Sequence, residues 1–128
     1  MDIMTLVAIG AGGALGSMTR FAMTQGVVWW LGSSFPYATM KINILGSFFM
    51  GLLVKSAGEV GSPSATMLSF FKIGVLGGFT TFSSFSLDAV SLMDHGDWVG
   101  FGAYVFGSVV ASIGGLIAGM ELTEVIWP

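Results

Sequence analysis

Four long apolar stretches dominate the chain, and short segments with polar and turn-forming residues separate them. A helix needs about 20 largely apolar residues to cross the hydrocarbon core of a bilayer. Each of the four stretches reaches that length. We therefore predict membrane-spanning helices at about residues 3–24, 37–56, 66–94 and 98–121.

The segments between these helices are typical of connections at a membrane surface. Residues 24–36 (TQGVVWWLGSSFP) contain two tryptophans, which favour the membrane–water interface, and end at a proline. Residues 57–65 (AGEVGSPSA) have the composition of a loop, and residues 94–98 (DHGDW) form the last connection. Because the connections are short, we interpret residues 1–128 as a single domain.

Composition supports the same class of protein. Hydrophobic residues make up 54% of the chain and charged residues 9%, and the mean hydropathy is +0.88, whereas soluble domains carry about 25% charged residues. The predicted fold class is an all-α integral membrane protein. The absence of cysteine excludes disulfides and thiolate metal sites, and no basic cluster indicates a nucleic-acid partner.

The third apolar stretch is too long and too interrupted to form one plain spanning helix. At 1.5 Å per residue, residues 66–94 would extend well beyond a hydrocarbon core of about 30 Å. Near the middle, GVLGGFTTFSSFS (residues 74–86) places glycines and hydroxyl side chains at membrane depth. We interpret the stretch as two half-helices with a non-helical break whose freed carbonyls can bind a cation. The alternative is a continuous helix that the glycines only soften.

Small residues recur at the spacing of one helical turn. Such pairs let two helices approach closely in lipid, where the hydrophobic effect does not drive helix association. They are Gly12/Gly16, Gly74/Gly78, Gly115/Gly119 and Ser47/Gly51. The pattern predicts tight helix packing.

Basic residues divide evenly between the two sides of the predicted protein. Lys55 and Lys72 lie toward the side of both termini, and Arg20 and Lys41 lie toward the other. The positive-inside rule then gives no preferred orientation, so we predict insertion in both. Opposite copies can pair about a two-fold axis in the membrane plane as an antiparallel homodimer. The alternative is that four basic residues are too few for the rule to apply.

Polar residues inside the spans are costly in lipid and tend to mark a pathway. The candidates are Arg20 in the first helix, Asn43 in the second, Thr81, Ser83 and Ser84 in the third, and Tyr104, Ser108 and Ser112 at i, i+4 and i+8 of the fourth. Phe82 and Phe85 share one face of the second half-helix. Taken singly, each has a structural explanation: an interhelical hydrogen bond, a bond from a hydroxyl to the preceding turn, or packing. Together they favour permeation.

Three sequence segments resemble signatures of the Fluc (CrcB) family of fluoride channels. GGFTTFSSFS (residues 77–86) is similar to the third-helix motif G-G-x-T-T-F-S-T-F-S. ATMKINILGSFFMG (residues 38–51) resembles the second-helix G-T-L-x-x-N-x-x-G-S, and GGALGSMTRF (residues 12–21) resembles the first-helix G-G-x-x-G-x-x-x-R-F. The resemblance extends over all four predicted helices in order and spacing.

This resemblance implies a passive fluoride channel of the bacterial inner membrane that lowers cytoplasmic fluoride. It implies a dual-topology antiparallel homodimer with two pores. Pore positions would be Asn43, Phe82 and Phe85, with the positive ring edges facing the ion, and a polar track at Tyr104, Ser108 and Ser112. Arg20 matches a vestibule arginine. Carbonyls of Gly77 and Thr80, two from each subunit, would hold a structural sodium ion (Na⁺).

Four residues depart from the family pattern. Ala38 replaces a glycine, Asp88 replaces a frequent glutamate, and Phe106 stands where some members carry a polar group. Lys41 occupies a usually apolar position. It either extends to the interface or faces the vestibule and attracts anions.

Other classes of protein explain the sequence less well. A small multidrug exporter is also a dual-topology dimer of four-helix chains, but it needs a carboxylate in the first helix, and residues 3–24 contain none. We expect no enzymatic activity, because the single histidine, His95, lies in a polar loop. A purely structural helical protein would not require the interrupted third stretch.

Overall fold

The computed structural model describes residues 2–59, 61 and 63–128, and all regular structure in these residues is helical. Its elements follow the chain as α1 (Ile3–Leu31), α2 (Tyr37–Glu59), α3 (Ala65–Ser69), the π-helix η1 (Phe70–Leu76), α4 (Gly77–Phe79), α5 (Phe82–Asp94) and α6 (Trp98–Ile126). Four segments are long and apolar enough to cross a membrane, with α3 to α5 forming one of them over Ala65–Asp94. The prediction of four spanning segments is confirmed.

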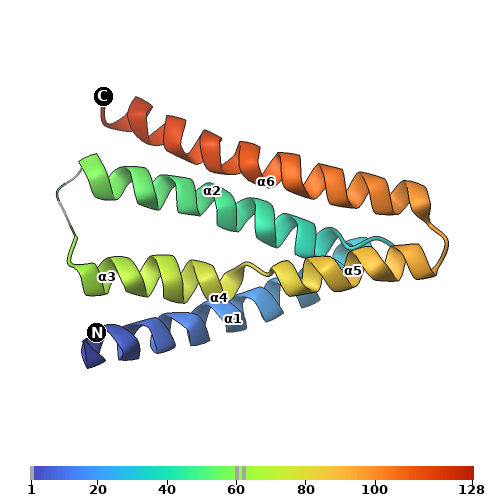
Figure 1. Ribbon diagram of the computed structural model, residues 1–128, viewed down its shortest axis with the longest axis horizontal. Coiled ribbons are helices and arrows are strands. Elements are labelled where there is room, and N and C mark those ends of the chain that lie inside the picture. The colour runs from blue at the N-terminus through green and yellow to red at the C-terminus, as the bar shows by residue number, and fades with distance from the viewer. Residues whose placement is uncertain (1, 60, 62) are drawn as a thin grey trace.

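The four segments run roughly along one long axis (Figure 1). The two termini and the connection between α2 and α3 lie at one end, and the connections before α2 and α6 lie at the other. α2 packs mainly against α6, while α1 packs along η1 and α4. The sides assigned to the basic residues from the sequence therefore correspond to the two ends of the bundle.

The first helix is longer than the sequence predicted. It was expected to end near residue 24, but α1 continues to Leu31 and includes most of the predicted connection. Gly26 does not end the helix, and the apolar residues that follow it remain helical as far as Leu31. The stop comes at Gly32, whose φ of 76° a residue with a side chain rarely adopts and whose N–H donates to Val28 O at 2.9 Å.

Side-chain caps set the start of several helices. Asp2 accepts a hydrogen bond from Met4 N, Ser64 accepts one from Met67 N, and Asp97 accepts one from Gly100 N. Each cap satisfies a backbone donor that has no partner within its own helix. The caps at Ser64 and Asp97 fix where the third and fourth segments enter the bundle.

The predicted close packing at small residues is confirmed. A Cβ atom added to Gly16 would collide with the backbone of Val75 and Phe79, and one added to Gly78 would collide with Gly13. The α2–α6 contact is equally tight, because a Cβ at Gly119 would collide with Phe48 O. These helices touch backbone to backbone, as small residues permit in membrane proteins.

Replacing Gly16 by alanine is expected to destabilise the protein by about 1–3 kcal/mol, because backbone atoms cannot move aside for the new methyl group. Gly26→Ala is the matched control on the same helix, since no heavy atom lies within 4 Å of the added Cβ. Thermal unfolding in detergent measures both. Equal unfolding temperatures for the two variants would contradict the packing described here.

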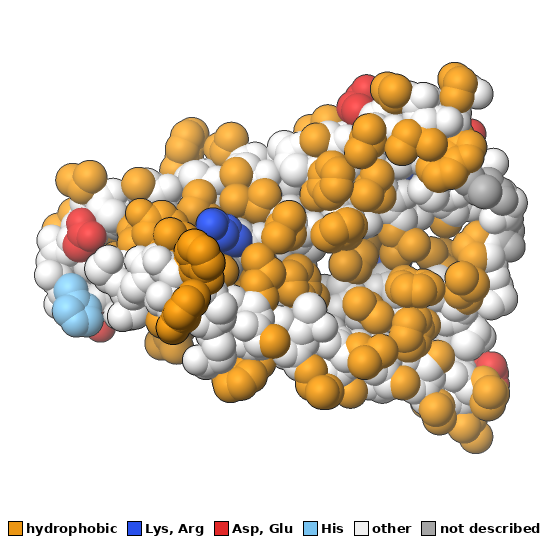
Figure 2. Space-filling model, turned by 180° about the vertical axis from the view of Figure 1, so that it is seen from behind, with side chains coloured by type: hydrophobic (Ala, Val, Ile, Leu, Met, Phe, Trp, Pro, Cys, Tyr) orange, Lys and Arg blue, Asp and Glu red, His pale blue; other side chains and the backbone are white. Residues whose placement is uncertain are grey.

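Few side chains are buried within a single chain. A small cluster of Phe85, Ala89, Leu92 and Tyr104 forms the buried core, while many large hydrophobic side chains are exposed on all four spanning segments. Hydrophobic side chains cover much of the face seen in Figure 2, and acidic side chains lie toward its two ends. Such a surface suits contact with lipid tails or with another apolar protein surface.

An ion cluster joins two helices at the end that carries the termini. Lys55 Nζ lies 2.6 Å from Glu124 Oε1 of α6 and 3.7 Å from Glu59 Oε1, one turn further along α2. The α2–α6 pair is thus linked by charges at this end, beyond its close backbone contacts.

Candidate functional site

The third spanning segment is interrupted at Thr80 and Thr81. α4 ends at Phe79, α5 begins at Phe82, and the two residues between them have extended backbone (ψ of 158° for Thr80, φ of −155° for Thr81). In a continuous helix the N–H of Thr81 would donate to Gly77 O. Here it donates to Asn43 Oδ1 at 2.8 Å. The interruption therefore frees the Gly77 carbonyl from its helical partner.

Asn43 of α2 holds the interruption by a pair of hydrogen bonds. Its Oδ1 accepts from Thr81 N at 2.8 Å, and its Nδ2 donates to Thr81 O at 3.0 Å. The amide thus satisfies both polar backbone groups of one extended residue. One N–H of Nδ2 remains for another acceptor. The family resemblance implied a pore position for Asn43, and the structure adds this anchoring contact.

α1 contacts the same region from the other side. Arg20 Nη1 donates to Thr80 O at 3.3 Å, and Ser17 Oγ lies 3.5 Å from Gly78 O. No sequence spacing indicated the Arg20 contact, because the two residues lie 60 positions apart. The extended residues are therefore held between α1 and α2.

Hydroxyl groups cluster where α5 begins. Thr81 Oγ1 caps the helix by accepting from Ser84 N at 3.1 Å, lies 3.1 Å from Ser84 Oγ, and lies 3.3 Å from Ser83 Oγ. The serines and Thr81 thus satisfy one another locally. Ser83 and Ser84 do not line the groove described next.

An open groove of about 550 Å³ lies between α2, the interruption, α5 and α6. It brings together eight of the predicted site residues: Asn43, Gly77, Thr80, Thr81, Phe82, Phe85, Ser108 and Ser112. Ser47, one turn after Asn43, also lines the groove, and its i, i+4 spacing from Asn43 is the sequence signal that could have found it.

The two phenylalanines have different surroundings. Phe85 is 9% exposed and packs against Tyr104 with ring centroids 5.3 Å apart, whereas Phe82 is 77% exposed. Their own rings are 5.3 Å apart, and both line the groove. Phe85 therefore belongs to the core as well as to the groove, while Phe82 is held by few contacts in a single chain.

The predicted polar stripe on α6 divides into two parts. Ser108, 4% exposed, and Ser112 line the groove, and Ser108 Oγ has no hydrogen-bond partner among the residues that the structure describes. Tyr104 is fully buried and donates to Asp88 Oδ2 at 3.1 Å. Tyr104 is not among the residues that line the groove. No role for Asp88 was predicted from the sequence, although a carboxylate inside a span indicates a polar partner.

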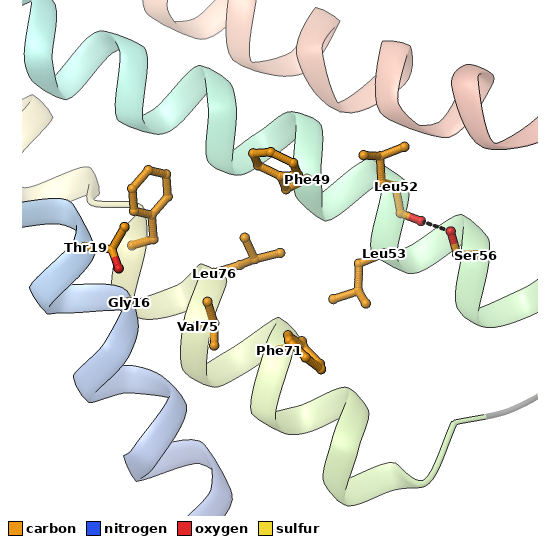
Figure 3. Close-up of a pocket in the computed structure, with 10 residues that line it drawn as sticks. Gly16, Thr19, Phe49, Leu52, Leu53, Ser56, Phe71, Val75 and Leu76 are labelled. Carbon is orange, nitrogen blue, oxygen red and sulfur yellow. Dashed lines mark hydrogen bonds between the residues drawn. The ribbon is translucent and has the colours of Figure 1, made fainter. Parts of the chain in front are cut away.

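A second hollow of about 470 Å³ lies between α1, α2, η1 and α4 (Figure 3). Its lining is almost wholly apolar, with side chains such as Phe49, Leu53 and Phe71 pointing into it. The two hydroxyls at its wall donate within their own helices, Thr19 to Leu15 O at 2.8 Å and Ser56 to Leu52 O at 2.6 Å. Among the described residues that line this hollow, no side chain offers an ion a free polar group.

Groups that could hold a metal are backbone oxygens rather than side chains. Within the described ranges, no three His, Cys, Asp or Glu residues lie close enough to bind a metal ion. The donor set expected from the sequence, Gly77 O and Thr80 O, consists of hard oxygens that suit sodium. Gly77 is exposed in the single chain and its carbonyl is released from the helix, so this residue fits the role. Thr80 O also fits, but it accepts from Arg20.

His95 has the surroundings expected of a loop residue. Its side chain is exposed, and Nδ1 lies 2.7 Å from Ser91 O in the preceding turn. It therefore lies in a local contact at the end of α5, separate from the groove.

Comparisons with known proteins identify the family. Residues 7–120 match the family described as CrcB-like protein, Camphor Resistance (CrcB). Among the relatives, a Rhodospirillum centenum protein is 45% identical over 117 residues, which cover 91% of this chain and 93% of that protein. A Nitrobacter winogradskyi protein is 41% identical over 121 residues, covering 94% and 96%. Both are named fluoride-specific ion channel FluC. The chain belongs to the CrcB family.

Proposed function

We propose that this protein is a fluoride-selective channel through which fluoride leaves the cell passively, so that its cytoplasmic concentration falls. The protein is a multi-pass protein of the bacterial plasma membrane, and its relatives carry the name fluoride-specific ion channel. The observation that carries the proposal is the groove lining. Within the described part of the chain, its residues combine amide, hydroxyl and aromatic groups, and none is ionisable.

This lining suits an anion that loses its water. A small dehydrated anion needs several hydrogen-bond donors, since an unpaired charge in a low-dielectric site is strongly disfavoured. The free N–H of Asn43 and the unpartnered hydroxyl of Ser108 are available donors. Ring edges of Phe82 and Phe85 add weak positive potential. Because no fixed positive charge lines the groove, the anion is not trapped there.

We further propose that the working unit is an antiparallel homodimer with two pores. Two observations support this proposal. The groove is open on one side, and two of its lining residues, Phe82 and Gly77, are exposed in the single chain. A second copy in the opposite orientation would cover these residues. The interruption at Thr80 and Thr81 would then lie at the middle of the membrane, beside the corresponding residues of the other copy.

The same arrangement would create a sodium site. Gly77 and Thr80 of each copy would contribute their backbone carbonyls, which gives four hard oxygen ligands. When bound, sodium would supply a positive charge that joins the two interruptions. A single chain offers half of this ligand set, so the site depends on the homodimer.

Fluoride flux without a proton gradient tests the proposed passive mechanism. Liposomes that contain the purified protein and are loaded with potassium fluoride are expected to release fluoride down its own gradient, at equal inside and outside pH, once a potassium ionophore lets potassium leave with it. A proton-coupled multidrug-type exporter, the alternative, would need an ionisable group in its pathway. Release that occurs only after a pH gradient is imposed would favour that alternative.

Dual topology makes a separate prediction. A tag at the C-terminus is expected to report both sides of the membrane in comparable amounts, because the basic residues divide evenly, with Lys55 and Lys72 toward the side of the termini and Arg20 and Lys41 toward the other. Adding two or three lysines after Trp127 should shift the population to one orientation and lower fluoride flux. A single orientation of the unmodified protein would contradict the proposed antiparallel dimer.

A further inference from the structure

We propose that the guanidinium of Arg20 and the central sodium ion compete for the carbonyl oxygen of Thr80, so that Arg20 weakens sodium binding. This inference rests on the sodium site of the proposed function. It gives Arg20 a role toward the cation, in addition to the vestibule role that the family resemblance implies.

The contact that carries the inference joins α1 to the interruption. Arg20 Nη1 donates to Thr80 O at 3.3 Å. The neighbouring residue, Thr81, is held from the opposite side by Asn43 of α2, with bonds of 2.8 and 3.0 Å. Thr80 thus lies between a fixed peptide unit and a cationic side chain. Arg20 is therefore a cationic side chain in direct contact with the proposed ligand oxygen.

The charge of Arg20 is not neutralised by a neighbouring acid. In residues 2–59, 61 and 63–128 the ion pairs that the structure contains both involve Lys55. A guanidinium stays protonated at every physiological pH. Its full positive charge therefore remains next to Thr80 O, in a half-buried position where water screens charges poorly.

Two cations on one carbonyl oppose each other. The oxygen has two lone pairs, so it can accept a hydrogen bond and coordinate an ion at once. The two positive charges would nevertheless repel each other, and this repulsion is strong where the effective dielectric constant is low. Removal of the Arg20 charge should therefore increase the affinity for sodium. A role of Arg20 confined to anchoring the Thr80 peptide predicts the opposite change, because a looser carbonyl binds an ion less well.

Sodium binding distinguishes these roles without measuring fluoride flux. The purified homodimer in detergent, freed of sodium in a buffer with a large organic cation, is titrated with sodium-22 in equilibrium dialysis. Arg20→Gln removes the charge and keeps a hydrogen-bond donor, and Arg20→Met removes both. Lys41→Gln is the control, because it deletes one exposed positive charge beside a separate pocket that Trp30 and Leu31 also line.

Both Arg20 variants are expected to bind sodium at least about tenfold more tightly than the unmodified protein, while Lys41→Gln stays within about twofold. Unchanged or weaker binding in the Arg20 variants would overturn the competition and leave the sodium site intact. Absence of bound sodium in the unmodified protein and in all variants would overturn the sodium site and this inference together. Failure of both Arg20 variants to fold in sodium would also overturn it, since Arg20 would then be a structural requirement.

Discussion

Replacing Phe82 by isoleucine is expected to lower fluoride flux at least about tenfold while the protein remains a folded dimer. Isoleucine keeps an apolar side chain but removes the ring edge that would face the ion. A tenfold loss requires only about 1.4 kcal/mol of lost stabilisation along the pathway. Phe82 is 77% exposed in the single chain, so the stability of the chain should change by less than about 0.5 kcal/mol. Fluoride efflux from liposomes and gel filtration measure the two effects.

Phe21→Ile is a matched control, because Phe21 is also exposed, at 66%, but lies on α1 away from the groove lining. Its flux should equal that of the unmodified protein. Phe85→Ile should lower both flux and stability, since the Phe85 ring packs on Tyr104 in the core. Full flux from a folded protein that carries both Phe82→Ile and Phe85→Ile would refute the role of these rings.

Replacing Asn43 by leucine is expected to destabilise the protein by about 2–5 kcal/mol and to abolish flux. The substitution leaves both the N–H and the C=O of Thr81 without their partner, and each unsatisfied buried group costs about 1–3 kcal/mol. The unfolding temperature of Asn43→Asp should lie between those of Asn43→Leu and the unmodified protein. A carboxylate can accept from Thr81 N but cannot donate to Thr81 O. Thermal unfolding in detergent gives this order directly.

Ser47→Ala is the control for Asn43, since Ser47 lines the same groove one turn later on α2. It removes a groove hydroxyl but none of the bonds to Thr81, so its unfolding temperature should stay near that of the unmodified protein. If Asn43→Leu unfolds no earlier than Ser47→Ala, then the side chain does not anchor the interruption.

The spanning segments were predictable because bilayer thickness sets a length that apolar composition reveals directly. Their ends were less predictable. α1 continues through Gly26 and the tryptophans to Leu31, since a glycine within a helix costs only about 1 kcal/mol and does not by itself end the helix. α1 ends where Gly32 adopts a positive φ. Gly26 and Gly32 lie in the same predicted connection, and the sequence does not indicate which of the two ends the helix.

The π-helix of Phe70–Leu76 could not be predicted from the sequence. A wider turn leaves the pattern of apolar residues almost unchanged, and such turns arise from tertiary contacts as much as from local preference. Here η1 packs along α1, with Gly74 close to Gly12. The repeated small residues indicated that contact, but they did not indicate the change in helix type.

The sequence allowed us to predict which residues belong to the candidate site, but not which of them bond to each other. Polar residues in apolar spans pointed to Asn43, Ser108 and Ser112, and the structure places all of them along one groove. The bonds from Asn43 to Thr81 and from Arg20 to Thr80 join residues 38 and 60 positions apart. Only the packing of α1 and α2 around the interruption brings these partners together. Tyr104, predicted on the same stripe as Ser108, instead bonds Asp88.

Parallel measurement of fluoride and chloride efflux tests the central claim most directly. Liposomes that contain the purified protein are loaded with potassium fluoride or potassium chloride, and efflux begins when a potassium ionophore is added. We predict rapid release of fluoride and release of chloride no faster than from protein-free liposomes. Rapid chloride efflux, or no efflux of either ion, would contradict the assignment of this protein as a fluoride-selective channel.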